Sequence, residues 1–470
     1  MIVSGIKPER VFYYFENLCA IPHGSGNCAA ISKYCICVAE KLGLEWSTDE
    51  HFNVIIKKSA SIGYENKPAI ILQGHLDMVC EKEADCDIDF LKDPIKLKIS
   101  GDLISAEGTT LGGDNGIAVA MVLAILEDNA LKHPPIEALF TTDEETGMFG
   151  AAGLDATRLN GKMLLNIDSE NEGVFTVGCA GGARAEITIP VSYESISGNC
   201  YEINVSGLVG GHSGVEIDKG RLNANVILGK FLSRLSCEYN IVEISGGLKD
   251  NAIPRSSKCI VFCEENPSVM INDFLDDNTI PTDKDLNVSI NSISINNKAF
   301  SYADSKKITE FLCTVPNGIQ SMSRDIEGLV ETSLNLGILY SDINGVHASF
   351  AVRSSKNTEK TKLLLRLNEI SKKFGGTFDE HGHYPAWEYR KVSLLRKKMI
   401  SVYEDIYGKS PIVETIHAGL ECGILSDKIS DLDAVSIGPD MWDIHTPRER
   451  ISISSVARVY EFICKLLCEI

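Results

Sequence analysis

The sequence contains no hydrophobic run that approaches the length of a membrane span, no low-complexity tract and no repeat of 20–50 residues. These absences argue against a transmembrane protein, a disordered chain and a solenoid. Basic residues are also few, because 45 Lys and Arg stand against 65 Asp and Glu, for a net charge of −20. Nucleic acids and anionic membrane surfaces attract basic proteins, so we expect neither as a partner.

The Cys-x-x-Cys spacing of redox and zinc motifs is also missing. The fifteen cysteines include no Cys-x-x-Cys, and the first sixteen residues lack the apolar core of a signal peptide. Scattered cysteines of this kind are typical of reduced, buried thiols. We therefore expect a cytoplasmic protein whose cysteines are reduced.

At 470 residues the chain is longer than one hydrophobic core usually organises, so we expect two domains. Strand and helix patterns alternate in its first third, which is typical of an α/β fold. Asn115–Leu131 is apolar on nearly every face and predicts a core helix. Buried strands are predicted at Pro68–Gly74, Ile136–Thr142 and Met163–Ile167.

Residues 185–383 have a different pattern, in which alternating strands are separated by longer amphipathic helices. The expected strands are Ala185–Val191, Tyr201–Val205, Ser257–Cys263, Leu286–Ser294 and His347–Val352. An α+β insert of this size exceeds one small unit, so we expect two lobes. The α/β pattern then returns, with a helix at Leu394–Tyr407 and a strand at Ala434–Ile437. Residues 1–184 and 384–470 are thus predicted to form one domain around the insert.

Metal-ligand side chains follow the predicted strands of the first domain. His75 comes directly after the first strand, Glu144 and Glu145 follow the second, and Asp168 follows the third. Sites in open α/β sheets gather at the carboxyl ends of strands. We therefore expect these four side chains to lie close together.

Two further residues complete the set. Asp114 stands between glycines at the start of the predicted core helix, and His445 follows the last predicted strand. Each residue alone has an ordinary explanation, such as a helix N-cap, a solvated charge run or a surface loop. Together, three carboxylates and two imidazoles can hold two divalent ions if Asp114 bridges them through both oxygens.

Two carboxylates remain for chemistry. Asp77 shares a face of an extended segment with His75, because residues i and i+2 point the same way, and it can orient that ring. Glu144 points differently from Glu145 and can take a proton from water and deliver it to a leaving amine. The set predicts a two-metal hydrolase.

These residues resemble those of the co-catalytic metallopeptidases, the family of aminoacylases, glutamate carboxypeptidases and dipeptidases. The resemblance covers essentially the whole chain, and within the family it is greatest to the Xaa-His (aminoacyl-histidine) dipeptidases. The segments that carry it are Ile21–Asn27, Gly74–Val79, Thr109–Gly116, Gly210–Gly214, Gly328–Ser333 and His417–Gly423. It implies a zinc-peptidase-like α/β catalytic domain, with a mixed sheet between helices, interrupted by an inserted α+β lid domain.

The resemblance also implies a role for each residue of the centre. His75 and Asp168 would hold one metal, Glu145 and His445 the other, and Asp114 would bridge them. Asp77 would orient His75, Glu144 would be the general base, and a cis peptide bond would follow Asp114. Zn(II) is the expected metal, with Co(II) and Mn(II) as alternatives.

Lid residues are implied as well. His212 would stabilise the tetrahedral oxyanion, for its own or for a partner subunit, which leaves monomer and homodimer open. Asn251 and Arg353 would bind the carboxylate end of the substrate, a task that suits the forked guanidinium group. Glu421 would contact the substrate amine.

We therefore predict a dinuclear-metal dipeptidase that cleaves unblocked dipeptides, Xaa-His preferred. Two alternatives stay open. One is another amide hydrolase of the same clan, such as an N-acyl-amino-acid deacylase or a tripeptidase. The other is a peptide-binding protein without catalysis, which would need neither Asp77 nor Glu144.

Overall fold

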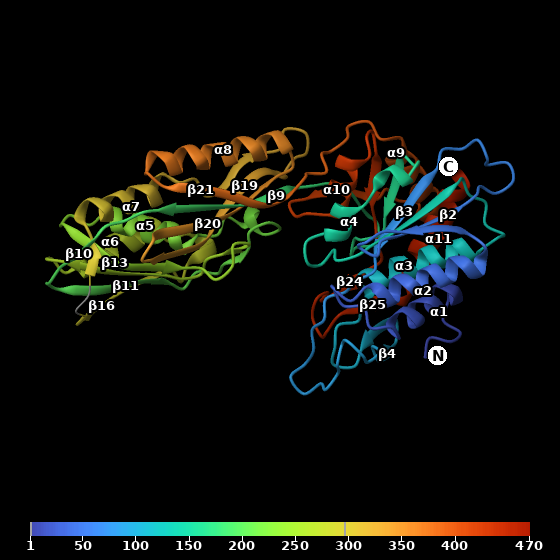
Figure 1. The fold of residues 1–470 in the computed structure, drawn as a ribbon, viewed down its shortest axis with the longest axis horizontal. Coiled ribbons are helices and arrows are strands. Elements are labelled where there is room, and N and C mark those ends of the chain that lie inside the picture. The colour runs from blue at the N-terminus through green and yellow to red at the C-terminus, as the bar shows by residue number, and fades with distance from the viewer. Residues whose placement is uncertain (1, 296–297) are drawn as a thin grey trace. The chain divides into compact units, whose positions relative to one another are not determined.

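The computed structural model describes residues 2–295 and 298–470. The chain divides into two compact units, which are coloured along the sequence in Figure 1. The first unit contains residues 1–178, 389–415 and 420–470, and the second contains residues 179–388 and 416–419. Each unit has its own core of buried apolar side chains. The predicted domain limits at residues 184 and 383, and the predicted two lobes, stay predictions.

The first unit is built on an eight-stranded mixed sheet in the order β1-β2-β6-β3-β7-β23-β8-β22. Strands β3, β6, β7 and β23 run parallel, so their carboxyl ends meet at one edge. Their buried side chains on both faces explain the continuous apolar runs in the sequence. The strands are β1 (Glu45–Thr48), β2 (Val54–Lys58), β3 (Ile70–His75), β6 (Ile136–Thr141), β7 (Met163–Asn166), β8 (Val174–Cys179), β22 (Ile412–Ile416) and β23 (Asp433–Ser436).

Helices pack on this sheet, and the core helix α3 lies directly against β3. The α-helices of the unit are α1 (Glu9–Cys19), α2 (Ala29–Leu42), α3 (Gly113–Glu127), α4 (Phe149–Gly153), α9 (Leu394–Tyr407), α10 (Glu421–Lys428) and α11 (Ile453–Glu469), and a 3₁₀ turn lies at Ala156–Arg158. A smaller sheet has the order β24-β25-β5-β4, with β4 (Leu97–Ser100), β5 (Leu103–Ala106), β24 (Met441–Trp442) and β25 (Arg450–Ser452).

Most predicted elements of this unit are confirmed, and α9 has the predicted limits. The core helix differs at its end, since α3 stops at Glu127 rather than at Leu131. Asp128 ends it, because its side chain accepts hydrogen bonds from the N–H groups of Ala130 (2.8 Å) and Leu131 (3.2 Å). Asp side chains compete for backbone N–H groups in this way.

The second unit is a nine-stranded antiparallel sheet in the order β16-β11-β15-β13-β19-β20-β9-β21, with β18 paired to β19. The five predicted strands are all present. The strands are β9 (Gly181–Ile189), β11 (Cys200–Ser206), β13 (Tyr239–Gly246), β15 (Ser257–Cys263), β16 (Asn287–Ile293), β18 (Gly318–Met322), β19 (Val330–Asp342), β20 (Gly345–Ser354) and β21 (Thr377–Tyr384).

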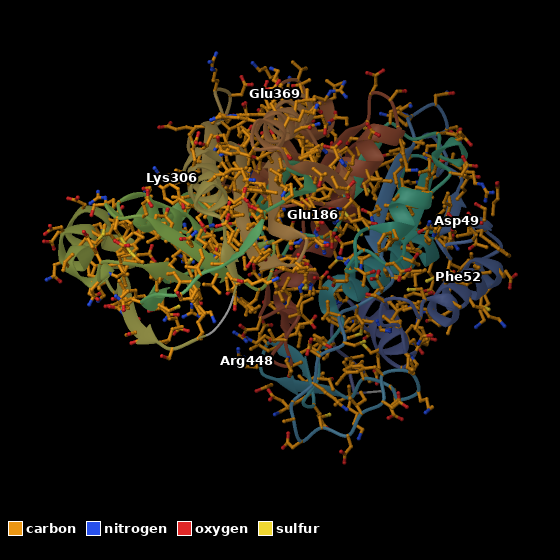
Figure 2. All side chains as sticks on the ribbon, turned by 60° about the vertical axis from the view of Figure 1, so that its left-hand side comes forward. Asp49, Phe52, Glu186, Lys306, Glu369 and Arg448 are labelled. Atoms are coloured by element: carbon orange, nitrogen blue, oxygen red, sulfur yellow. A yellow bond between two sulfur atoms is a disulfide. The ribbon has the colours of Figure 1, made fainter. Side chains whose placement is uncertain are left out.

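Among the described residues of this unit, four α-helices and two short ribbons accompany the sheet. The helices are α5 (Ala224–Ser233), α6 (Ile271–Asn278), α7 (Tyr302–Thr314) and α8 (Asn357–Lys373), with 3₁₀ turns at Ile217–Lys219, Pro267–Met270 and Pro281–Asp283. The ribbons pair β10 (Tyr193–Ser195) with β17 (Lys298–Phe300) and β12 (Gly211–His212) with β14 (Ala252–Ile253). Charged side chains such as Lys306 and Glu369 extend from the exposed surface of this unit (Figure 2).

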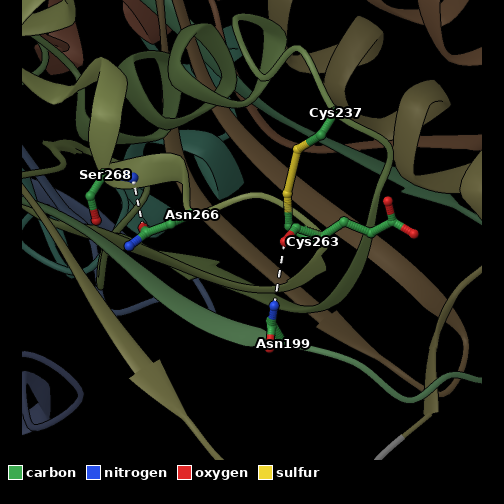
Figure 3. Close-up of a disulfide and its surroundings, with 6 residues drawn as sticks. Asn199, Cys237, Cys263, Asn266 and Ser268 are labelled. Atoms are coloured by element: carbon green, nitrogen blue, oxygen red, sulfur yellow. Dashed lines mark hydrogen bonds between the residues drawn. A yellow bond between two sulfur atoms is a disulfide. The ribbon is translucent and has the colours of Figure 1, made fainter.

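One disulfide corrects the expectation that every cysteine is reduced. Cys237 is bonded to Cys263, the last residue of β15 (Figure 3). The two residues come together because β13 and β15 are antiparallel and Tyr239 lies opposite Cys263. The remaining thirteen cysteines carry thiol groups. No helix in residues 2–295 or 298–470 has the combined length and apolarity needed to cross a membrane.

Candidate metal centre

The five predicted ligands come together in the first unit, at the carboxyl edge of the parallel strands. His75 is the last residue of β3, Asp168 follows β7 by two residues, and Glu145 lies in the loop after β6. Asp114 stands in the first turn of α3, and His445 lies between β24 and β25 with a left-handed backbone (φ 60°). His75 is buried and the His445 side chain is half-exposed.

The carboxylate of Asp114 lies between two groups of side chains. Its Oδ1 is 3.1 Å from Nε2 of His75, which is itself 3.5 Å from Oδ1 of Asp168. Its Oδ2 is 3.1 Å from Nε2 of His445, which is 3.0 Å from Oε2 of Glu145. In each group the nearest ligand atoms lie within 4.8 Å of one another. One carboxylate therefore serves two three-residue groups, one oxygen to each.

The backbone around Asp114 is not helical, although it lies in the first turn of α3. Asp114 and Asn115 depart from helical φ and ψ, and the peptide bond between them is cis, as the resemblance implies. Asn115 ties this turn to two neighbouring strands. Its Oδ1 accepts the N–H of His75 (3.1 Å) and its Nδ2 donates to the carbonyl of Ile167 (2.7 Å). Sequence reasoning missed this role, although Asn115 follows Asp114 directly.

Asp77 contacts both His75 and the loop after β6. Nδ1 of His75 is 2.9 Å from the backbone carbonyl of Asp77 and 3.5 Å from its carboxylate, and the predicted role of Asp77 in orienting the ring stays a prediction. The carboxylate also accepts the backbone N–H groups of Glu144 (3.1 Å) and Glu145 (3.3 Å) and the hydroxyl of Ser25 (2.8 Å). Asp77 thus fixes the loop that carries Glu144 and Glu145. The hydrogen bond from Ser25 gives a structural role to one residue of Ile21–Asn27, a segment that carries the resemblance.

Burial and neighbouring charges shift the pKa values of the side chains in this centre. Burial raises the pKa of Glu144 well above its usual value, and the charge of Asp168 adds to this effect. Burial also raises the pKa of Glu145, although its hydrogen bond to His445 opposes the shift. Hydrogen bonds to Asp114 and Glu145 raise the pKa of His445 to about 10. The surrounding carboxylates therefore stabilise positive charge at this position.

Glu421 is buried against β3 and β6, the strands that lead to His75 and Glu145. It is fully buried in α10, where its Oε2 accepts hydrogen bonds from Nε2 of Gln73 and the hydroxyl of Thr141, both at 2.6 Å. Burial raises its pKa to about 8. Its predicted contact with a substrate amine stays a prediction.

In the second unit, the ring of His212 is held by its own loop. Nδ1 accepts the backbone N–H groups of Gly214 (3.1 Å) and Val215 (3.2 Å). A nitrogen that accepts two hydrogen bonds carries no proton, so the neutral ring bears its proton on Nε2. Burial and the charge of Arg353 lower the pKa of His212, which favours this neutral form. His212 therefore presents a fixed N–H donor.

The other predicted lid residues lie in the same unit. The carbonyl of Asn251 accepts the N–H of Ser213 (2.8 Å), which places Asn251 beside the His212 loop. Arg353, in β20, donates from Nη1 to the hydroxyl of Tyr384 (2.9 Å). Its Nε is buried and has no hydrogen-bond partner among the described residues. A buried donor of this kind is suited to an incoming anion.

His417 was not among the predicted site residues, although it lies in a segment that carries the resemblance. Its Nε2 is 2.7 Å from the hydroxyl of Ser333, and burial together with the charge of Arg353 lowers its pKa to about 4. Glu449 was also missed, and its carboxylate contacts the backbone of residues 111–114. The sequence signal for Glu449 was its position four residues after the predicted ligand His445.

Comparisons with known proteins agree with this geometry. The model of Peptidase family M20/M25/M40 matches residues 71–469. The chain is 35% identical over 480 aligned positions to the cytosol non-specific dipeptidase of Escherichia coli, covering 100% of this chain and 99% of that relative. It is 36% identical to the aminoacylhistidine dipeptidase of Vibrio alginolyticus, whose crystal structure matches with a TM-score of 0.93 over 99% of this chain and 97% of that one.

A more distant structure, aminopeptidase PepT from Bacillus cereus, shares the fold at 17% identity, with a TM-score of 0.57 over 99% of both chains. These matches confirm the resemblance and the α/β fold class expected from the sequence. The chain belongs to Peptidase family M20/M25/M40.

Proposed function

We propose that this protein is a dinuclear-metal-dependent dipeptidase that hydrolyses unblocked dipeptides, with Xaa-His substrates preferred. The observation that carries the proposal is the Asp114 carboxylate, which offers one oxygen to His75 and the other to His445. Two full-length relatives are named as dipeptidases.

The residues fit two divalent ions. His75, Asp114 and Asp168 would hold one, and Asp114, Glu145 and His445 the other. Three carboxylates leave two such ions with a net charge near +1, and Oε1 of Glu145 is buried with no hydrogen-bond partner in the part of the chain that the structure describes. Mixed oxygen and nitrogen donors suit Zn(II) first, and also Co(II) or Mn(II).

When bound, the two ions would polarise the scissile carbonyl and lower the pKa of the attacking water. Glu144 would take a proton from that water as its oxygen attacks the carbonyl carbon. It would then give the proton to the amide nitrogen as the C–N bond breaks. A raised pKa helps Glu144 to hold the proton between the two steps.

The second unit would supply substrate contacts, and we propose that it is the lid. Nε2 of His212 would donate to the oxyanion, a role supported by its fixed tautomer. Arg353 and Asn251 would bind the substrate carboxylate, supported by the unpartnered Nε of Arg353 among the described groups. Glu421 would contact the amine of the substrate.

The preference for Xaa-His substrates is the most specific part of the proposal. The relative from Vibrio alginolyticus is named for aminoacylhistidine substrates, whereas the relative from Escherichia coli is named non-specific and cytosolic. We propose the cytoplasm as the location, on the basis of that name, and a homodimer as the alternative to a monomer.

The test is turnover of Ala-His, Ala-Ala and N-acetyl-Ala-His by protein stripped of metal and then restored with Zn²⁺, Co²⁺ or Mn²⁺. Metal-dependent cleavage of the free dipeptides alone supports a dipeptidase, and faster cleavage of Ala-His supports the preference. Cleavage of the acetylated compound alone would assign the protein to the deacylases. Two bound ions without cleavage of any compound would favour a peptide-binding protein.

A further inference from the structure

One carboxylate binds four consecutive backbone N–H groups beside the candidate centre. Oε2 of Glu449 accepts from Leu111 (2.7 Å) and Gly112 (3.2 Å). Its Oε1 accepts from Gly113 (2.8 Å) and from Asp114 itself (3.2 Å). Both oxygens of Glu449 are therefore occupied by the segment that carries the shared carboxylate.

The glycines of this segment suit that contact. Gly112 has a left-handed backbone (φ 70°), which turns successive N–H groups toward one point and forms an anion-binding concavity. At Gly113, a Cβ atom would lie 3.1 Å from Oε1 of Glu449, closer than such contacts normally are. Glu449 is only 3% exposed, so these N–H groups have little access to water and need an acceptor from the protein.

The backbone of Glu449 belongs to the segment that directly follows His445. Glu449 lies four residues after His445, and its own N–H donates to the carbonyl of Thr446 (3.0 Å), which closes the turn between them. The next residue, Arg450, starts β25, which pairs with β5. The turn that directly follows His445 is thus joined to the Asp114 segment through the buried side chain of Glu449.

We propose that Glu449 is a positioning residue that sets the distance between Asp114 and His445, and so the geometry of both metal sites. The proposal rests on the metal ligands assigned under the proposed function. Glu449 is neither a ligand nor a proton carrier, because both of its oxygens accept backbone hydrogen bonds. Supporting contacts of this type hold ligands in place, and their loss weakens metal binding.

The variant Glu449→Gln keeps the shape of the side chain but replaces one acceptor oxygen by an NH₂ group, which cannot accept two of the four N–H groups. The matched control is Glu137→Gln. Glu137 is 3% exposed, accepts the N–H groups of Asn160 (2.8 Å) and Gly161 (2.9 Å), and lies near the start of β6, whose opposite end leads to the centre.

Metal-free protein is titrated with Co²⁺ against a competing chelator, and melting temperatures are measured without metal. We expect Glu449→Gln to bind at least one Co²⁺ ~10–100-fold more weakly than wild type. Glu137→Gln should bind Co²⁺ as wild type does, although it melts lower. Wild-type affinity of Glu449→Gln at both sites would overturn the inference alone. A wild-type protein that binds fewer than two ions would overturn the proposed function and this inference with it.

A second measurement needs no variant and covers the case in which Glu449→Gln does not fold. Hydrogen exchange of residues 111–114 is followed in metal-free wild-type protein. We expect slow exchange before any metal is added, because Glu449 already holds these amides. Exchange at the rate of an unstructured peptide would overturn the inference, since the segment would then be ordered by metal and not by Glu449.

Discussion

Replacing Glu144 by Gln isolates its proton chemistry from its position. The two side chains have nearly the same shape, and the backbone N–H of residue 144 keeps its hydrogen bond to Asp77 (3.1 Å). Glu144 stands outside both groups that share Asp114, so the variant should retain two ions. The amide cannot take a proton from water. We therefore expect kcat to fall ~10²–10⁴-fold, the usual contribution of a general base, or about 3–5 kcal/mol in the barrier.

The structure also offers a competing interpretation. His75, Glu144 and Glu145 form a third group whose ligand atoms lie within 4.8 Å of one another. If Glu144 were a ligand, Glu144→Gln would lose metal along with activity. The matched variant is Glu145→Gln, which makes the same chemical change one residue along the chain, at a residue that faces His445 (3.0 Å).

The assay combines metal content after dialysis with turnover of Ala-His at saturating metal. Glu144→Gln should keep its metal and lose turnover, whereas Glu145→Gln should lose metal first. Near-normal turnover of Glu144→Gln would refute its role as the base. Equal metal loss in both variants would make Glu144 a ligand.

Four further predictions follow from the geometry. His212→Ala should lower kcat ~10²–10³-fold, as expected for loss of an oxyanion donor, and an effect confined to KM would contradict that role. The pKa of His445 is raised to about 10 and that of His75 well above its usual value, so both rings are protonated at pH 7 without metal. Each Zn²⁺ ion must then displace one proton, and its affinity should rise about tenfold per pH unit between pH 6 and 8; calorimetry that finds such a rise for only one of the two ions would argue against one of the two imidazoles as a ligand. The pKa of Glu421, about 8, lies above its unfolded value of 4.5, so the wild-type protein loses stability as pH rises through 8 and this carboxyl ionises. Glu421→Gln has no such group to ionise. In urea unfolding of metal-free protein, the difference in stability between the variant and wild type should therefore shift in favour of the variant by about 2 kcal/mol from pH 6 to pH 8. Cys237→Ser removes a disulfide that closes a loop with a sequence separation of 26 residues, and it should lower the stability of the second unit by about 3 kcal/mol. A thiol assay of unreduced, denatured wild-type protein should find thirteen thiols, and a result of fifteen would refute the disulfide.

The sequence predicted the parallel strands and the side chains at their ends because both are local patterns. A buried strand is a continuous apolar run, and His75 or Asp168 is visible directly after one. Parallel strands bring their carboxyl ends to one edge, so the clustering of these residues follows from fold class alone. The cis bond after Asp114 came from the resemblance and is present.

Contacts between distant segments had no such pattern. Glu449 meets Gly113 across 336 residues, and its position four residues after His445 indicates a place near the centre but not this partner. The bond between Cys237 and Cys263 depends on which strands pair, and strand order in the second unit is not a property of single segments. The end of α3 at Glu127 was missed because Ala130 and Leu131 were included in the helix, although three polar residues, 127–129, separate them from the apolar run.

The position of β23 has a consequence for how the protein is made. This strand lies between β7 and β8 in the sheet, although about 260 residues of chain separate it from them. During synthesis, β7 and β8 leave the ribosome long before the strand that must fill the space between them. The first unit therefore stays incomplete until the chain is almost finished, with unpaired strand edges that favour aggregation. His445 is synthesised later still, so a complete set of ligands exists only after the whole second unit has been made.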